Sequence, residues 1–297
     1  MANKVRKGWF TLKIGFIGTG VMGAAMAKHL QLAGHELFVF TRTKSKAEAL
    51  LKNGATWCET LASVAHAADV IFTIIGMPTD VEAVYLGEDG LISHAKKGAI
   101  LVDMTTSSPE LAKRIASEAS KHNIICLDAP VTGGDIGAKN GTLTMMVGGS
   151  ELAFSHIKNV FDLMASTVVY MGASGSGQHA KMANQIAIAG AVLGMAESLT
   201  YAKEAQLDLE SMLHILSSGS ASSWQVQNMG PRVLAQDYAP GFYMKHFIKD
   251  MTIASTEAKQ MNQALVGLDL VLSLYKGLQE KGYEELGTQA LVKHYDW

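Results

Sequence analysis

The sequence predicts an α/β fold in which a doubly wound, mostly parallel sheet is joined by a long helix to an all-α C-terminal domain. Short β-rich segments alternate with helical segments through residue 171, as is typical of a parallel sheet. An almost uninterrupted apolar helix follows Lys181, and beyond Ala205 only helical periodicity remains. We therefore expect an α/β domain at residues 12–174 and a helical domain, which includes the connecting helix, at residues 175–297.

The first glycine-rich turn carries a dinucleotide-binding pattern. Residues 13–17 are β-rich and residues 24–32 are helical, and the turn between them reads Gly18, Thr19, Gly20, Val21, Met22 and Gly23. In this strand–turn–helix context GxGxxG predicts a Rossmann domain. Gly18 permits the tight turn, Gly20 lets a pyrophosphate approach the backbone, and Gly23 lets helix and strand pack closely. A glycine turn without a ligand is the alternative.

The end of the second predicted strand, residues 36–40, indicates which dinucleotide is bound. NAD-binding folds usually place an acid there to accept from the ribose 2′-hydroxyl, but this chain has Thr41-Arg42-Thr43-Lys44-Ser45-Lys46. The Arg42 guanidinium can form a fork onto a 2′-phosphate, with Thr43 and Lys46 as further donors. We predict NADP(H) rather than NAD(H). A solvated basic loop would leave the missing acid unexplained.

The remaining strands and helices of the first half complete the alternation. Strands are expected at residues 70–75, 99–104, 124–127, 143–147 and 167–171, and helices at residues 59–68, from Pro109, and at 151–164. Gly76, Met77 and Pro78 end the strand 70–75, where a cofactor would lie. The ligand site is therefore expected at the carboxyl ends of the strands.

Thr132, Gly133 and Gly134 follow another strand end. A hydroxyl followed by two glycines can offer side-chain and backbone donors to a small carboxylate. A tight loop that needs positive φ explains the same residues equally well.

The helix after Gly172 carries an ammonium and an amide on one face. Lys181 and Asn184 are three residues apart, and from Met182 to Ala196 the only other polar residue is Gln185. A helix that is apolar nearly all round is buried, so its polar side chains are expected to have hydrogen-bond partners or a functional role. A solvated lysine is the ordinary alternative. The helix is expected where a two-domain enzyme would have its cleft.

The C-terminal half is expected to contain helices at residues 207–216, 248–263 and 266–281, with a polar loop at 217–230 around Trp224. Lys249 opens the second of these helices beside Asp250. It could reach a cofactor or substrate, or form a surface charge pair.

Composition excludes several classes of function. The 297 residues have a net charge of −2, which argues against nucleic-acid binding, and the helix after Lys181 is too short and interrupted to span a membrane. Cys58 and Cys126 lack metal-ligand spacing, so no metal is expected, and they suggest buried thiols in a reducing, cytoplasmic compartment. Residues 1–11 are interpreted as a loose extension rather than a signal peptide.

Four ordered motifs together carry a family resemblance: residues 18–23, residues 128–134, residues 172–185, and Lys249-Asp250. The chain resembles the β-hydroxyacid dehydrogenases, which include 3-hydroxyisobutyrate dehydrogenase, tartronate semialdehyde reductase and the glyoxylate/succinic semialdehyde reductases. Thr132 stands where the family usually has serine, which keeps the hydroxyl and adds a methyl group. Some members have two asparagines after the lysine, whereas this chain has Asn184 and Gln185. The tartronate semialdehyde reductases share this Asn-Gln pair.

The resemblance implies the roles of the site residues. Lys181 would be the general acid/base, Thr106 and Lys249 would lie near the nicotinamide ribose and ring, and the substrate would contact Thr132, Gly133, Gly134, Asn184 and Gln185. Together with the NADP(H) preference predicted from Arg42, the activity implied is NADPH-dependent interconversion of a short aldehyde- or keto-carboxylate and its hydroxyacid, in a homodimer or homotetramer. An NAD-dependent 3-hydroxyisobutyrate-type dehydrogenase is the alternative. A non-catalytic nucleotide-binding protein is disfavoured because Lys181 is present.

Overall fold

The computed structural model describes residues 11–297, which form two compact units. The first unit ends at Lys181 and the second is Met182–Trp297. The boundary falls inside the long helix α9 (Ser176–Glu204), a few residues after the predicted boundary at 174/175. The extension expected at residues 1–11 lies, except for Thr11, outside the described residues.

The first unit is built on a sheet that has nine strands in the described part of the chain. Six of them run parallel in the order β3-β2-β1-β4-β5-β6, which is the doubly wound order of dinucleotide-binding folds. β8 is antiparallel to β6 and β7, and β9 pairs parallel to β8. The strands are β1 (Lys13–Ile17), β2 (Glu36–Phe40), β3 (Thr56–Trp57), β4 (Val70–Thr73), β5 (Ile100–Asp103), β6 (Ile125–Asp128), β7 (Val131–Thr132), β8 (Leu143–Gly149) and β9 (Ala165–Gly172).

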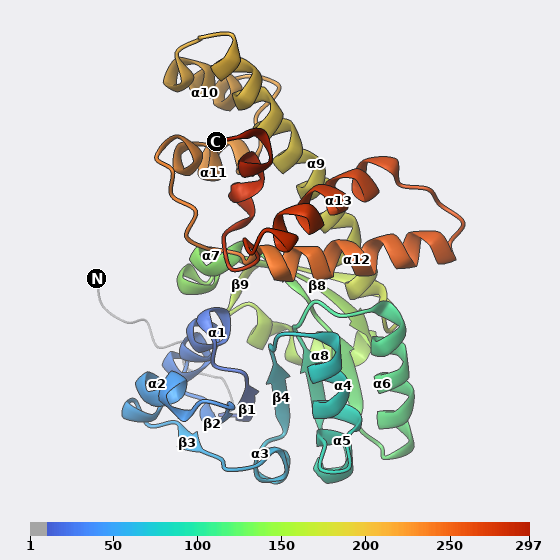
Figure 1. Ribbon diagram of the computed structural model, residues 1–297. Coiled ribbons are helices and arrows are strands. Elements are labelled where there is room, and N and C mark those ends of the chain that lie inside the picture. The colour runs from blue at the N-terminus through green and yellow to red at the C-terminus, as the bar shows by residue number, and fades with distance from the viewer. Residues whose placement is uncertain (1–10) are drawn as a thin grey trace. The chain divides into compact units, whose positions relative to one another are not determined.

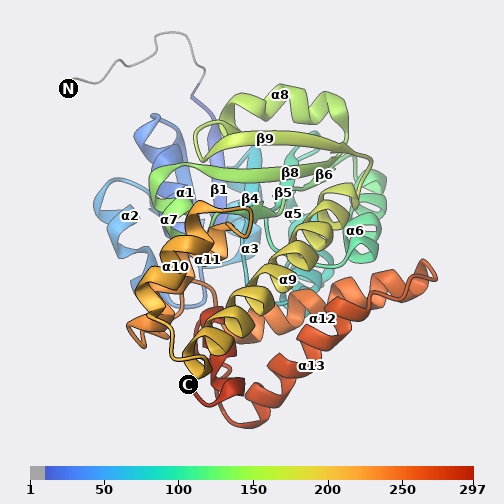
Figure 2. The same ribbon diagram turned by 90° about the horizontal axis from the view of Figure 1, so that it is seen from above.

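Helices cover both faces of this sheet (Figure 1). They are α1 (Val21–Leu32), η1 (Lys44–Ala47), α2 (Glu48–Lys52), α3 (Leu61–Ala67), α4 (Pro78–Leu86), α5 (Leu91–His94), α6 (Pro109–Lys121), α7 (Gly134–Asn140) and α8 (Glu151–Phe161). Because successive strand residues point to opposite faces, Phe72 of β4 packs in the core with α1 and α8, whereas Ile71 packs with α3 to α6. Figure 2 shows α8 beside β8 and β9. The continuous apolar runs of the strands follow from this two-sided burial.

The second unit is helical, as the sequence predicts. The remainder of α9 is followed by α10 (Leu209–Ser218), α11 (Trp224–Leu234), α12 (Met244–Gln260), α13 (Val266–Glu280) and η2 (Thr288–Tyr295). They share one hydrophobic core, in which the rings of Phe247 and Tyr275 meet edge to face at 5.3 Å. Within the described part of the chain, no helix combines the length and apolar character needed to cross a membrane.

Two local expectations were wrong, and several short elements were not anticipated. The loop expected around Trp224 contains helix α11, because the Ser223 side chain accepts from the Val226 backbone N–H (3.1 Å) and caps it. Helix α12 begins at Met244, four residues before the expected start, so Lys249 lies in its second turn. The short helices that were not anticipated are η1, α2, α4, α5, α7 and η2. Of these, α4 and α7 begin at residues noted only as turn or ligand signals.

Candidate functional site

The glycine-rich turn connects β1 to α1 where the strand order reverses, between β1 and β4. Gly18 has φ +93°, and a Cβ there would collide with the Ile74 carbonyl oxygen. A Cβ on Gly23 would collide with the Gly18 carbonyl oxygen, whereas a Cβ on Gly20 would meet no atom within 4 Å. Gly18 and Gly23 are therefore needed by the fold, and Gly20 keeps one side of the turn open. This arrangement fits a pyrophosphate approaching the start of α1.

The turn also contains an orphaned polar atom. The Thr19 side chain is buried, and its hydroxyl makes no hydrogen bond within the described part of the chain. Buried hydroxyls normally have a partner, so an unsatisfied one beside the open turn is consistent with a bound polar ligand.

Arg42 lies beside the start of α4. Its side chain is 83% exposed, and its Nη1 is 3.5 Å from Oδ1 of Asp80, whose Oδ2 accepts from the Met77 backbone N–H (3.2 Å). This contact brings Arg42 next to Met77 and Pro78. Because an exposed ion pair of this length contributes about 0–1 kcal/mol, it leaves the guanidinium available to a phosphate. Thr43 and Lys46 are exposed in the same turn.

The loop after β5 carries Thr106 between two buried neighbours. The Thr105 N–H donates to Asp103 Oδ1 (3.0 Å), and the Thr105 hydroxyl accepts from the Ile75 N–H (3.0 Å). Gln178 of α9 donates from Nε2 to the Thr105 carbonyl (2.8 Å), and its Oε1 accepts from the Ser107 N–H (3.0 Å). Thr106 is thus held on both sides by one glutamine amide.

Asp128 ends β6 and caps the N-terminus of α9. Its carboxylate accepts from the Gly175 N–H (2.8 Å) and the Gln178 N–H (2.9 Å). Burial raises the pKa of Asp128, and the backbone hydrogen bonds oppose that rise. Lys181, one turn further along α9, is only 6% exposed. The helix that carries the predicted acid/base is therefore fixed at its first turn by the end of a sheet strand.

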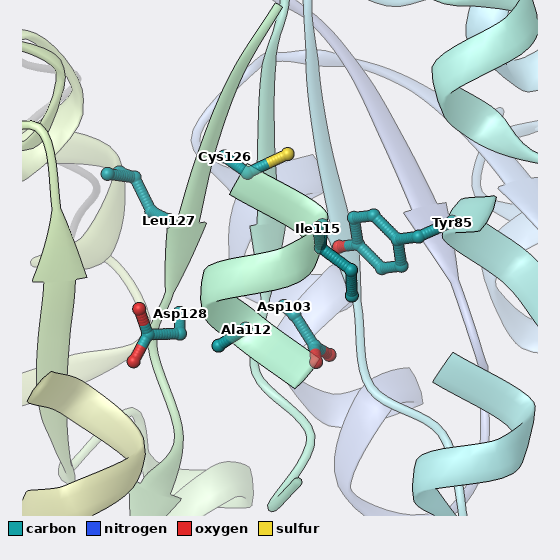
Figure 3. Close-up of a pocket in the computed structure, with 7 residues that line it drawn as sticks. All are labelled: Tyr85, Asp103, Ala112, Ile115, Cys126, Leu127 and Asp128. Atoms are coloured by element: carbon teal, nitrogen blue, oxygen red, sulfur yellow. The ribbon is translucent and has the colours of Figure 1, made fainter. Parts of the chain in front are cut away.

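A small cavity of about 10 Å³ lies beside these groups, near the size of one water molecule. Figure 3 shows its lining side chains around the turn of α6 that carries Ala112 and Ile115. Asp103 accepts from the Thr73 hydroxyl (3.0 Å), which also bonds the Tyr85 hydroxyl (2.8 Å). Burial raises the pKa of Asp103 to about 6, although hydrogen bonds from Thr105 and Thr73 oppose the rise. The cavity belongs to the polar network that supports the Thr106 loop.

Thr132, Gly133 and Gly134 form the junction between β7 and α7. Gly133 and Gly134 have φ values of +124° and +64°, and α7 begins at Gly134. Thr132 pairs with Thr144 of β8. The strained loop that the sequence allowed is present, and consecutive backbone N–H groups in such a turn are suited to an anion. The carboxylate role stays a prediction.

In the second unit, four side chains form a chain of contacts. Asn184 Nδ2 donates to Gln185 Oε1 (2.9 Å), and Gln185 Nε2 donates to Asp250 Oδ2 (2.7 Å). Lys249 Nζ lies 2.9 Å from Asp250 Oδ1, with side-chain exposures of 9% and 1%. The surface charge pair considered for these residues is therefore wrong, because the pair is buried.

Sequence reasoning missed Asp103, Asp128, Thr105 and Gln178 as parts of this site. Asp128 and Gln178 could have been noticed from weak signals in the sequence. An acid at a strand end and a glutamine in a first helical turn are both typical of helix N-terminal capping. Asp250 was noted only as a neighbour of Lys249. No pattern in the sequence joined any of them to its partner.

Two family models together match nearly the whole chain. Residues 13–172 match a family model described as the NAD binding domain of 6-phosphogluconate dehydrogenase, and residues 175–295 match one described as NAD-binding of NADP-dependent 3-hydroxyisobutyrate dehydrogenase.

Relatives and solved structures agree with these matches. A probable mitochondrial 3-hydroxyisobutyrate dehydrogenase-like protein of Arabidopsis thaliana is 48% identical over 94% of this chain and 84% of its own length. The 2-hydroxy-3-oxopropionate reductase of Escherichia coli is 37% identical over 95% of this chain and 96% of its own. The structure of a Mycobacterium tuberculosis 3-hydroxyisobutyrate dehydrogenase with L-serine has a TM-score of 0.87 and 25% identity, covering 96% of this chain and 99% of that one.

Proposed function

The chain belongs to the β-hydroxyacid dehydrogenase family of NAD(P)-dependent oxidoreductases, and from this premise we propose that it uses NADP(H) to interconvert a short aldehyde- or keto-carboxylate and its hydroxyacid. The observation that carries the proposal is Lys181, a buried lysine on a helix whose first turn is fixed by Asp128. A lysine is rarely this buried, and a fixed helix gives its ammonium a defined position.

The residues around the glycine-rich turn suit the cofactor. The open face at Gly20 and the start of α1 would hold the pyrophosphate, while Arg42, Thr43 and Lys46 would hold the 2′-phosphate. Met77, Pro78, Thr106 and Lys249 would lie along the rest of the cofactor. When bound, NADPH supplies the hydride.

The chain's own residues supply the proton and the orientation of the substrate. The Lys181 ammonium would stabilise the negative charge that develops on the carbonyl oxygen and deliver the proton to it. Asn184 would hold the substrate without adding charge, and its amide is oriented by Gln185. Thr132 and the backbone N–H groups of Gly133 and Gly134 would hold the carboxylate. In the direction of hydroxyacid oxidation, Lys181 would accept the hydroxyl proton.

The test is a comparison of initial rates with NADPH and with NADH, against glyoxylate, succinic semialdehyde, tartronate semialdehyde and methylmalonate semialdehyde. We expect a clear preference for NADPH and one preferred acid. Arg42→Ala should weaken NADPH binding and leave NADH binding unchanged. Activity with NADH alone would favour the NAD-dependent dehydrogenase and contradict the role of Arg42.

Lys181→Ala separates an enzyme from a non-catalytic nucleotide-binding protein. General acid catalysis contributes about 10²–10⁴-fold, so kcat should fall by that factor while NADPH still binds. Lys158→Ala removes an exposed lysine that pairs with Asp162 and should leave kcat unchanged. Wild-type turnover in Lys181→Ala would exclude the lysine as the acid/base.

We further propose that the protein is a cytoplasmic homodimer or homotetramer. Light scattering coupled to size exclusion measures the mass directly, and a monomer at micromolar concentration would contradict this proposal.

A further inference from the structure

Gln178 has a place in the structure that the family resemblance did not assign. Its side chain is fully buried, with 0% exposure, in the first turn of α9. A buried side-chain amide needs hydrogen-bond partners for both its NH₂ group and its oxygen. The partners of Gln178 therefore show which part of the structure it holds.

The partners of Gln178 are two backbone groups that flank a single residue. Nε2 donates to the Thr105 carbonyl at 2.8 Å, and Oε1 accepts from the Ser107 N–H at 3.0 Å. Thr105 and Ser107 are both almost fully buried, so these peptide groups have no access to water and require such partners. The amide thus fixes the peptide groups on either side of Thr106.

The same loop is tied to the neighbouring strand end. The Thr105 hydroxyl accepts from the Ile75 N–H, directly before Gly76, Met77 and Pro78. The ends of β4 and β5 are therefore joined at the edge of the sheet where a doubly wound fold binds its ligand. Gln178 holds this joined segment from the side of α9.

The backbone of Gln178 is fixed as well as its side chain. Its N–H donates to Asp128 Oδ2 at 2.9 Å, and Gly177 leaves no room for movement, because a Cβ there would collide with the Met146 and Asp128 carbonyl oxygens. Lys181 follows three residues later on the same helical face. One residue therefore connects the Thr106 loop, the end of β6 and the turn that carries Lys181.

We propose that Gln178 is a positioning residue for hydride transfer, which holds the Thr106 loop at a fixed place relative to Lys181. The proposal rests on the proposed function, because it assumes that Thr106 lies near the nicotinamide ribose and that Lys181 transfers the proton. A displacement of about 1 Å between reacting groups can reduce the rate by about 100-fold. Loss of the Gln178 amide should therefore slow chemistry without abolishing cofactor binding.

The experiment compares Gln178→Met with Gln289→Met. Methionine keeps the length of the side chain and removes both hydrogen bonds. Gln289 is a matched control: it is buried in the second unit, and its Nε2 donates to the Asp237 and Ala239 carbonyls at 3.0 and 3.1 Å. Both variants lose a buried amide that holds a loop backbone, so both should lose thermal stability.

Only Gln178→Met should change the chemical step. We expect its kcat to fall about 10- to 100-fold at saturating NADPH, with NADPH affinity within about 3-fold of wild type. The kinetic isotope effect with NADPH deuterated at the transferred position should increase, because hydride transfer becomes more strongly rate-limiting. Gln289→Met should keep the wild-type kcat per active site and the wild-type isotope effect.

The outcomes separate this proposal from the proposed function. A wild-type enzyme that reduces none of the four acids overturns both. An active wild type whose Gln178→Met variant keeps its kcat and isotope effect overturns the role of Gln178 alone. A loss of kcat in both glutamine variants would assign Gln178 a purely structural role and also overturn the proposal.

Discussion

The two compact units bury their acids with different partners. In the first unit, Asp128 accepts from two backbone N–H groups, and Asp103 accepts from a backbone N–H and a hydroxyl. In the second unit, Asp250 lies against the ammonium of Lys249 and the amide of Gln185. The donors in the first unit are N–H groups at the start of α9, one N–H of the loop after β5 and a hydroxyl of β4, and all of them are neutral. Away from helix ends, an all-helical core has few unpaired backbone donors.

The difference has an energetic consequence. Where the partners are neutral, burial outweighs the hydrogen bonds and the pKa of Asp103 and of Asp128 rises. Where the partner is a cation, each charge compensates the other, and removing one leaves the other buried. The first unit should therefore tolerate neutralisation of its acids better than the second. Three substitutions test this comparison.

Asp250→Asn should have the largest effect on stability. It leaves the Lys249 ammonium buried without its carboxylate, which costs about 3–5 kcal/mol in the free energy of unfolding. Urea unfolding followed by far-UV circular dichroism measures this loss. Glu285→Gln is the control, because Glu285 pairs with Lys245 at 2.5 Å on the surface and should contribute about 0–1 kcal/mol. Equal losses in the two variants would refute the contrast between buried and exposed pairs.

Asp128→Asn should lower the free energy of unfolding by less, about 1–3 kcal/mol. The substitution leaves no buried ammonium without its carboxylate, and the amide oxygen still accepts one N–H. The amide nitrogen must then face the other N–H of the α9 turn, which accounts for the loss. Asp208→Asn provides the comparison: Asp208 caps α10 through the Ser211 N–H (2.8 Å) in an exposed position, where asparagine caps as well as aspartate. A loss for Asp128→Asn as large as that for Asp250→Asn would break the comparison.

Asp103→Asn should have the smallest effect at neutral pH and the clearest effect on pH dependence. The native pKa of about 6 lies above the ordinary value of 3.8, so the folded state binds the proton more tightly than the unfolded state. Stability is therefore greatest below about pH 4, falls as the pH rises to about 6, and stays level above it as far as this group is concerned. Asparagine keeps an acceptor for Thr105 and cannot ionise, so the variant should lose the part of the decline that Asp103 contributes, keep the part that the raised pKa of Asp128 contributes, and be at least as stable as wild type at pH 7.

Urea unfolding at intervals from pH 4 to pH 8 measures that slope. Asp162→Asn, which removes an exposed acid that pairs with Lys158, is the control for the loss of a surface carboxylate. If Asp103→Asn kept the wild-type decline, the raised pKa could not belong to Asp103.

Much of the fold could be predicted because its signals are local. Gly18 and Gly23 are required by steric contacts within a turn and its neighbouring strand end, and the alternation of apolar strands and helices reflects which faces are buried. The predicted Rossmann and helical domains are confirmed. The unexpected helix α11 and the early start of α12 are also informative, because most of the stability of a helix in a protein comes from packing against the core, which the local sequence does not show.

The candidate site was predictable only in part. The types of the residues, such as Lys181, Asn184, Arg42 and the glycines, indicated the chemistry from the sequence alone. The groups that hold them could not be found in this way, because their partners are distant along the chain. Asp128 and Gly175 are separated by 47 residues, Gln178 and Thr105 by 73, and Gln185 and Asp250 by 65.

The sequence by itself determined the alternation of the main strands and helices, the glycine-rich turn and the missing acid after the second strand, since each depends on neighbouring residues and on backbone sterics. Only the tertiary structure decided that one glutamine holds both sides of Thr106, that Asp128 fixes the start of α9, and that Lys249 and Asp250 form a buried pair. A hydrogen bond between side chains and distant backbone groups leaves no periodicity in the sequence, because its partners meet only when the sheet and the helices are in place.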